Sequence, residues 1–165
     1  MKALVVFDSF FGNTEKAAVE IARNLGSREE VTVSNIKTIK PEDILSYSLL
    51  IVGSPTRAFR PSPGMSVFLK SIKPGSLEGM RTAAFDTRIH ENETGSRFIT
   101  LMMKLFGYAA LPIHKSLIKK GGIEVSEPAG FFVNDTKGPL KKGENERAAE
   151  WARSIRKVVL SEEEP

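Results

Sequence analysis

The sequence predicts an α/β protein in which helices cover both faces of a parallel β-sheet. Short apolar runs alternate five times with segments whose apolar residues recur every three or four positions, and glycines and prolines separate them. The 165 residues also have the length of one domain, which we expect over residues 1–160, with an acidic disordered tail at 161–165. Such sheets are joined by right-handed crossovers and bind ligands at the carboxyl ends of their strands.

Five apolar segments have the length and composition of strands: 3–7, 31–36, 48–53, 81–86 and 123–133. The first (ALVVF) and the third (SLLIVG) carry no charge, as is typical of strands that are buried on both faces. Pro128 falls inside the last segment and cannot donate a ladder hydrogen bond, so we expect a bulge or an edge strand there.

The segments between the strands have helical spacing: 14–25, 63–72, 95–120, the last helix from Ala148 to Val159, and a short helical or loop stretch from Pro41. Gly26 follows the first helix as a C-cap. Ser62 followed by Pro63 is an N-cap with proline at the first helical position. We expect Gly107 and Pro112 to interrupt the third segment.

The composition excludes several kinds of site. Because the chain has no cysteine, it has no disulfide, cysteine-ligated zinc, iron–sulfur cluster or thiol nucleophile. Only His90 and His114 remain as imidazole ligands, so no metal site is expected. The net charge of +4 is too small to indicate nucleic acid as a partner.

No segment of the chain is typical of a membrane or export signal. The apolar run at the amino terminus stops at Asp8, after fewer residues than a signal-peptide core of about 7–15 needs. The longest nearly uncharged stretch, 98–113, is shorter than the roughly 20 residues that span a bilayer. We therefore expect no membrane span and a cytoplasmic location.

The loop after the first expected strand has the features of a phosphate site; its residues are Ser9, Phe10, Phe11, Gly12, Asn13 and Thr14. Backbone N–H groups at a helix N-terminus attract anions, the Ser9 and Thr14 hydroxyls add donors, and Gly12 permits close approach. The loop is neither a Walker A nor a dinucleotide motif. The alternative is an ordinary strand–helix turn capped by Asn13 or Thr14.

This loop, together with the element order, resembles the flavodoxin family, whose members wrap the phosphate of FMN in a Ser/Thr-rich loop that ends in Gly-Asn-Thr. Ser9, Gly12, Asn13 and Thr14 match that pattern, whereas Phe11 stands where flavodoxins often have a hydroxyl. The resemblance implies FMN as cofactor and a flavodoxin-like three-layer αβα sandwich with a five-stranded parallel sheet of order 2-1-3-4-5. No insertion of roughly 20 residues interrupts the fifth strand, so the resemblance is to the short-chain form.

In that family, the loops after the third and fourth strands enclose the flavin ring. The matching residues here are Ser54, Pro55, Thr56, Arg57, Ala58, Phe59, Asp86, Thr87 and Arg88. The resemblance places Thr56 at the polar edge of the flavin and Phe59 against its ring. The alternatives are a core or partner-facing aromatic for Phe59, and a solvated polar loop for residues 86–88.

Two departures from the family bear on function. Neither ring loop contains the Trp and Tyr that flavodoxins stack on the flavin, which leaves one ring face open to a substrate or a partner chain. Flavodoxins are usually acidic, whereas the charges of residues 54–63 and 86–93 balance here. We therefore expect a less negative potential for the fully reduced flavin than in acidic flavodoxins.

Three functions remain open. The first is an FMN-dependent electron carrier that exchanges electrons with a redox partner protein and needs no catalytic side chain. The second is an NAD(P)H-dependent reductase of a small quinone-like or nitro substrate. The third is a non-redox module of the same fold that has lost FMN. The apolar segment 98–113 either packs in the core, borders the flavin or forms a homodimer.

Overall fold

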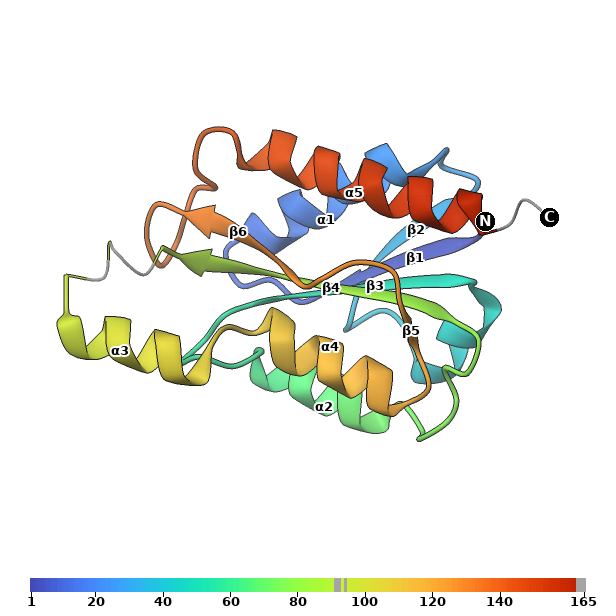
Figure 1. Ribbon diagram of the computed structural model, residues 1–165, viewed down its shortest axis with the longest axis horizontal. Helices are drawn as coiled ribbons and strands as arrows, with labels where there is room; N and C mark the ends of the chain where they lie inside the picture. The colour runs from blue at the N-terminus through green and yellow to red at the C-terminus, as the bar shows by residue number, and fades with distance from the viewer. Residues whose placement is uncertain (91–92, 94, 163–165) are drawn as a thin grey trace.

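The computed structural model describes residues 1–90, 93 and 95–162. A parallel sheet of order β2-β1-β3-β4-β5 crosses the molecule, and a further strand, β6, also pairs with β4 (Figure 1). The strands are β1 (Ala3–Phe7), β2 (Val31–Asn35), β3 (Leu49–Pro55), β4 (Arg81–Ile89), β5 (Ile123–Glu124) and β6 (Ala129–Val133). The predicted α/β class and strand order are confirmed.

Helices cover both faces of this sheet (Figure 1). On one face lie α1 (Asn13–Leu25) and α5 (Glu144–Ser161), and on the other lie α2 (Pro63–Ser71) and α4 (Ala110–Lys119). A short 3-10 helix, η1 (Pro41–Ser46), precedes β3. This is the expected three-layer αβα sandwich, and residues 163–165 of the expected tail lie outside the described residues.

Strand β1 shows why the apolar run at the amino terminus folds as it does. Ala3, Val5 and Phe7 belong to the core beneath α1 and α5, whereas Leu4 and Val6 belong to the core beneath α2 and α4. All five are buried because each side of the strand meets a helical layer.

The fifth strand is split into β5 and β6. Arg81 pairs with Ile123 and Phe85 pairs with Ala129, so the partner segment contains two extra residues between these pairs. Pro128 immediately precedes β6, where its missing N–H costs no ladder bond. The bulge expected from Pro128 therefore appears as a break between two short strands.

Three expected boundaries differ in the structure. Pro112 does not interrupt a helix, since it lies in the first turn of α4, where no intrahelical N–H bond is needed. The break falls at Gly107 alone, whose φ is +71°. Strand β3 extends to Pro55, where it pairs with Thr87 of β4, and β4 extends to Ile89, where it pairs with Val133 of β6. Ser54, Pro55 and residues 86–88 are therefore strand residues rather than loop residues.

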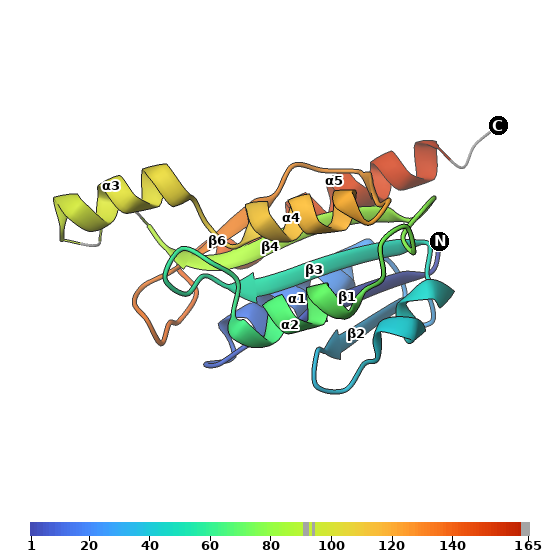
Figure 2. The same ribbon diagram turned by 90° about the horizontal axis from the view of Figure 1, so that it is seen from below.

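Helix α3 (Arg97–Phe106) projects away from the sheet beside the carboxyl ends of β4 and β6 (Figures 1 and 2). Phe98, Leu101 and Leu105 are 69%, 53% and 66% exposed, whereas Ile113 in α4 is buried in the core. The apolar segment 98–113 thus divides into an exposed first half and a core-packing second half. No described helix is long and apolar enough to cross a membrane.

Candidate functional site

A cleft with a volume of about 510 Å³ lies at the carboxyl ends of β1, β3 and β4. Most of the residues expected to bind a cofactor line it: Ser9, Phe10, Phe11, Asn13, Thr14, Pro55, Thr56, Arg57, Ala58, Thr87 and Arg88. Ile89, Val133 and Thr136 complete the lining and were not expected. The volume lies within the range of roughly 300–1,000 Å³ that small-ligand sites have.

The N-terminus of α1 forms one end of the cleft. Gly12 is the N-cap, with a φ of +84°, and no side chain caps this helix, whereas Ser62 caps α2 and Ser96 caps α3. The N–H groups of the first turn, which begins at Asn13 and Thr14, have no acceptor within the helix. They form a donor set suited to an anion.

The buried side chain of Asp8 fixes the conformation of the loop at residues 9–14. This buried residue accepts hydrogen bonds from the Ser9 N–H at 2.9 Å and from the Ser62 hydroxyl, and the Ser9 hydroxyl accepts one from the Gly12 N–H at 3.0 Å. The sequence reasoning did not single out Asp8. The sequence feature that could have indicated a role for Asp8 is a charged residue directly after an uncharged buried strand.

Asn13 and Thr14 have separate roles. The Asn13 side-chain amide donates to the backbone carbonyl of Lys137 at 2.9 Å, so it fastens the 134–139 loop to α1 and brings Thr136 to the cleft. The hydroxyls of Thr14 and Thr87 lie 2.8 Å apart and share one hydrogen bond. One of the two hydroxyl protons is therefore left for a ligand.

Residues 54–60 form a tight turn beside the cleft. Arg57 and Arg60 exchange backbone hydrogen bonds of 2.8 and 3.0 Å, and Ala58 and Phe59 between them have φ values of +45° and +68°. Such a turn normally carries glycine or asparagine, so its backbone is strained. Ser54 is buried and accepts from the Ser62 N–H at 2.9 Å, which anchors the turn from beneath.

Phe59 does not line the cleft. It lines a neighbouring groove between α2 and α4. Two other phenylalanines, Phe10 and Phe11, line the cleft and are 53% and 46% exposed. Arg57 lies over the Phe10 ring, with its Cζ atom 5.1 Å from the centroid. Exposed phenyl rings at a cleft suit a planar ligand.

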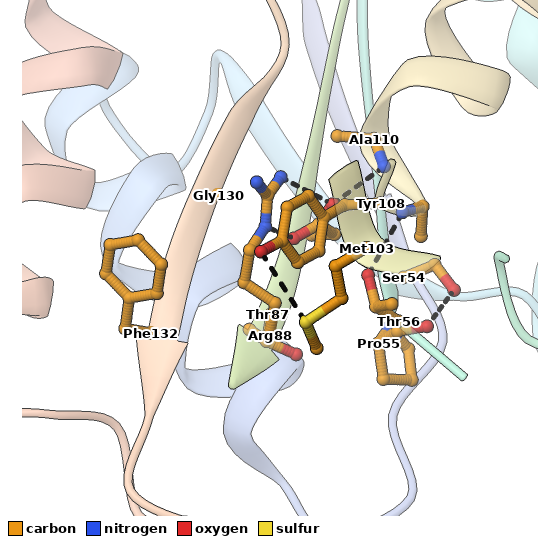
Figure 3. A network of polar contacts seen from close by, with 12 residues as sticks. Ser54, Pro55, Thr56, Thr87, Arg88, Met103, Tyr108, Ala110, Gly130 and Phe132 are labelled. Atoms are coloured by element: carbon orange, nitrogen blue, oxygen red, sulfur yellow. Dashed lines mark hydrogen bonds and ion pairs between the residues drawn. The ribbon is translucent and has the colours of Figure 1, made fainter. Parts of the chain in front are cut away.

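Asp86 and Arg88 form a buried ion pair on β4 (Figure 3). Arg88 donates from Nε and Nη2 at 2.5 and 2.7 Å, and the Ala110 N–H donates to the same carboxylate at 2.8 Å. Burial raises the pKa of Asp86, and the Arg88 guanidinium opposes that rise. Asp86 is thus the N-terminal anchor of α4, and it does not line the cleft.

The Arg88 guanidinium lies between Gly130 and the Tyr108 ring (Figure 3). Its Cζ atom is 3.7 Å from the centroid of that ring, and a Cβ atom on Gly130 would come within 2.2 Å of it. Gly130 therefore makes room for the ion pair. Thr56, expected at the polar edge of a flavin, accepts from the Ala109 N–H at 3.0 Å and holds the start of α4.

The cleft has a cationic lining. It includes Arg57 and Arg88 and, within residues 1–90, 93 and 95–162, no Asp or Glu. Glu93, which the sequence placed near the ring loops, accepts a hydrogen bond from Lys141, and Glu91 lies outside the described residues. The described residues also contain no group of three potential metal ligands among His, Cys, Asp and Glu.

Trp151 and Tyr108 lie away from the cleft lining. Trp151 packs edge-on against Phe85 and Phe131 and donates from Nε1 to the Ser126 hydroxyl at 2.8 Å. Trp151 therefore packs against the core instead of lining the cleft. No Trp or Tyr lines the cleft in the described part of the chain.

A parallel sheet of order 2-1-3-4-5 between two helical layers, with a cleft at the carboxyl ends of its central strands, defines a flavodoxin-like protein. No protein-family model matches the chain. The chain is 28% identical over 163 residues to a flavodoxin of Aquifex aeolicus, a match that covers 91% of this chain and 86% of that protein. The expected resemblance to the flavodoxin family is confirmed by this relative and by the fold.

Solved structures share the fold. A flavodoxin from the domain Archaea has a TM-score of 0.74 at 21% identity, covering 96% of this chain and 99% of that one. Flavodoxin 2 from Bacillus cereus has a TM-score of 0.77 at 22% identity, covering 95% and 99%. Rubredoxin oxygen:oxidoreductase from Desulfovibrio gigas has a TM-score of 0.73 at 20% identity, and the match covers 99% of this chain and 37% of that chain.

Proposed function

We propose that the chain binds FMN in the 510 Å³ cleft and carries electrons between redox partners. The observation that carries this proposal is the uncapped N-terminus of α1, which opens beside the Thr14 and Thr87 hydroxyls at the carboxyl ends of the central strands. This is a donor-rich anion site at the place where parallel sheets hold ligands.

The lining fits the parts of FMN. The phosphate would bind the first-turn N–H groups of α1 and the free hydroxyl proton of the Thr14–Thr87 pair. The ring would lie among the apolar and aromatic side chains of Phe10, Ile89 and Val133. When bound, the flavin supplies the one- and two-electron chemistry. The chain orients it, excludes water and sets the local charge.

The charge at the cleft determines in which direction the protein shifts the reduction potential of a bound flavin. Arg57 favours a negative charge on a bound ligand, whereas the charge of Arg88 is balanced by Asp86, and no described carboxylate in the lining opposes Arg57. The potential of the couple to the fully reduced flavin is therefore less negative than in flavodoxins with acidic clefts. A redox titration that gives an equally low potential contradicts this statement.

The deciding experiment is flavin binding. The purified chain is expected to be yellow or, once freed of flavin, to take up one FMN with quenching of its fluorescence. Riboflavin, which lacks the phosphate, should bind much more weakly, because the α1 site loses its anion. A colourless chain that binds neither molecule rejects the proposal.

A reductase with the same cofactor is the second candidate, because no Trp or Tyr lines the cleft in the part of the chain that the structure describes. An open ring face would admit a small quinone. Multiple turnovers of a benzoquinone with NADH or NADPH by the FMN-loaded chain would favour the reductase. Reduction of the flavin by dithionite alone, without turnover by either nucleotide, would favour the carrier.

A further inference from the structure

The positive charge of this protein is concentrated on one side of the sheet. Residues 56–77 and 95–123, which include α2, α3 and α4, carry nine Lys and Arg: Arg57, Arg60, Lys70, Lys73, Arg97, Lys104, Lys115, Lys119 and Lys120. These two segments contain no Asp or Glu. The rest of the chain has the other 15 basic residues and all 20 acidic ones, a net charge of −5. A nearly neutral chain therefore has one strongly basic face.

Of the described acidic residues nearest in sequence to these two segments, Glu124 lies at the amino end of β4, Asp86 is buried against Arg88, and Glu93 accepts a hydrogen bond from Lys141. Glu42 and Asp43 belong to η1, which precedes β3, and Glu78 precedes β4, so all three are at the amino ends of the strands. The cleft is at the carboxyl ends. The field of the basic face is therefore least compensated beside the proposed flavin site.

The basic face also contains a groove. A groove of about 620 Å³ runs between α2 and α4, with Met102 of α3 at one side. Its apolar lining includes Phe59, Leu69 and Leu111, and its basic residues are Arg60, Lys70 and Lys115. Ala58 lines both this groove and the cleft, so the two adjoin at this residue.

Helix α3 extends this face with apolar side chains. Phe98, Leu101 and Leu105 follow the i, i+3, i+7 spacing of one helix stripe, and more than half of each side chain is exposed. The helix projects from the body beyond the start of α4 (Figure 2). Apolar side chains beside a basic groove match the usual anatomy of a protein interface, with apolar contacts and charged surroundings.

We propose that α2, α3, α4 and the 57–61 turn form the docking surface for an acidic redox partner protein that exchanges electrons with the flavin. The inference rests on the proposed function, because it supplies the partner of the same cleft. Its support is charge complementarity: Arg57 at the cleft and Arg60, Lys70 and Lys115 in the adjoining groove form a positive field that steers an acidic surface to the edge of the cleft. A symmetric homodimer through this surface is disfavoured, because it would bring two basic faces together and their positive charges would repel each other.

The test uses one electron acceptor in two forms that have opposite net charge. The FMN-loaded, fully reduced chain is mixed with oxidised cytochrome c, which is basic, and with the same cytochrome succinylated on its lysines, which is acidic. One electron leaves the flavin and reduces the haem iron from Fe(III) to Fe(II), which is followed by absorbance. Raising the salt from about 20 to about 500 mM should slow the reaction with the acidic form by about tenfold or more. The reaction with the basic form should stay constant or become faster.

Matched charge reversals locate the surface. Lys70→Glu with Lys115→Glu is expected to slow reduction of the succinylated cytochrome at low salt by about tenfold. The control, Arg156→Glu with Lys157→Glu on the exposed side of α5, makes the same change in net charge on the opposite face and should alter the rate by less than about twofold. Leu105→Ser on α3 should weaken the complex, whereas Leu160→Ser on α5 should not.

Three results overturn the proposal: a salt dependence of opposite sign, equal effects of the two double variants, or a dimer of the chain that covers Leu105. Salt-sensitive binding to phosphatidylglycerol vesicles, without any preference for the succinylated cytochrome, would assign the surface to a membrane instead. If the chain binds no FMN, the proposed function fails separately. Sedimentation of the flavin-free chain with succinylated cytochrome c at low salt then still tests the surface.

Discussion

Arg88 forms two hydrogen bonds with the carboxylate of Asp86, two positions earlier on the same strand, and the Asp86 side chain is fully buried. Residues i and i+2 of a strand point to the same side, so the pair can form within β4 without help from a loop. The same carboxylate accepts the Ala110 N–H and starts α4. The ion pair therefore joins the cleft wall to the helix that carries part of the basic face.

Replacing Arg88 by methionine should make stability depend more strongly on pH than it does in the unaltered chain. Burial already raises the pKa of Asp86, and without Arg88 nothing of opposite charge opposes this rise. The folded variant then holds a proton that the unfolded chain releases above its pKa of about 3.9, so the free energy of unfolding falls as the pH rises. The slope can reach about 1.4 kcal/mol per pH unit up to the raised pKa. Urea unfolding from about pH 5 to pH 8 measures it.

The control for this variant is Arg153→Met. Arg153 pairs with Glu146 on the surface of α5, where an ion pair contributes about 0–1 kcal/mol. Its pH profile should follow that of the unaltered chain. Parallel profiles for Arg88→Met as well would show that Asp86 is not held in a low-dielectric site.

Gly12→Ala should weaken FMN binding beyond its effect on the fold. Gly12 has a φ of +84°, and an added Cβ meets no atom within 4 Å, so the substitution strains only the backbone. We expect a loss of about 1–2 kcal/mol of stability and at least about a tenfold loss of FMN affinity. Gly143→Ala is the matched control: this N-cap of α5 has a φ of +90° and equally open space. It should lose similar stability and leave FMN binding unchanged, as fluorescence titration would measure.

Arg57→Gln should make the flavin a stronger reductant. The exposed guanidinium lies at the cleft and stabilises negative charge there, so its removal should lower the potential of the fully reduced couple by on the order of 50 mV. Spectroelectrochemical titration measures the shift. Arg156→Gln, on α5, changes the net charge equally and should shift the potential by less than about 10 mV. Equal shifts in potential for Arg57→Gln and Arg156→Gln would mean that Arg57 lies no closer to the flavin ring than Arg156 does.

Ala58→Gly should stabilise the fold. Ala58 has a φ of +45°, which costs a residue with a Cβ about 1–2 kcal/mol and glycine very little. Glycine also has the greater entropy in the unfolded chain, which offsets part of this effect. The free energy of unfolding should therefore rise by about 0.5–1 kcal/mol, which corresponds to a rise in Tm of about 1–4 °C. Ser154→Gly in the interior of α5 should instead lower the Tm. Calorimetry compares the two, and a fall in Tm for Ala58→Gly would mean that the turn is not strained.

Much of the site could be predicted because its signals are local. The Ser9–Thr14 loop lies between a buried strand and a helix start, and its residues except Gly12 line the cleft. Phe59 was not predictable, because its direction depends on a positive φ at a residue other than glycine. Thr136 could not be found either. It reaches the cleft only through the bond from Asn13 to the carbonyl of Lys137, which joins segments far apart in the sequence.

The sequence by itself determined the layered α/β fold, because a strand as apolar as residues 3–7 must be buried on both faces and the alternation with helices allows that burial. It also determined the place of the anion site, since a loop between strand and helix lies at the carboxyl edge of the sheet. Only the tertiary structure decided that Asp86 is buried with Arg88 paired to it, and that Arg57, Arg60, Lys70 and Lys115 line the cleft and the groove beside it. The burial of Asp86 against the start of α4 and the gathering of these cations depend on packing between separate segments, which composition and periodicity do not encode.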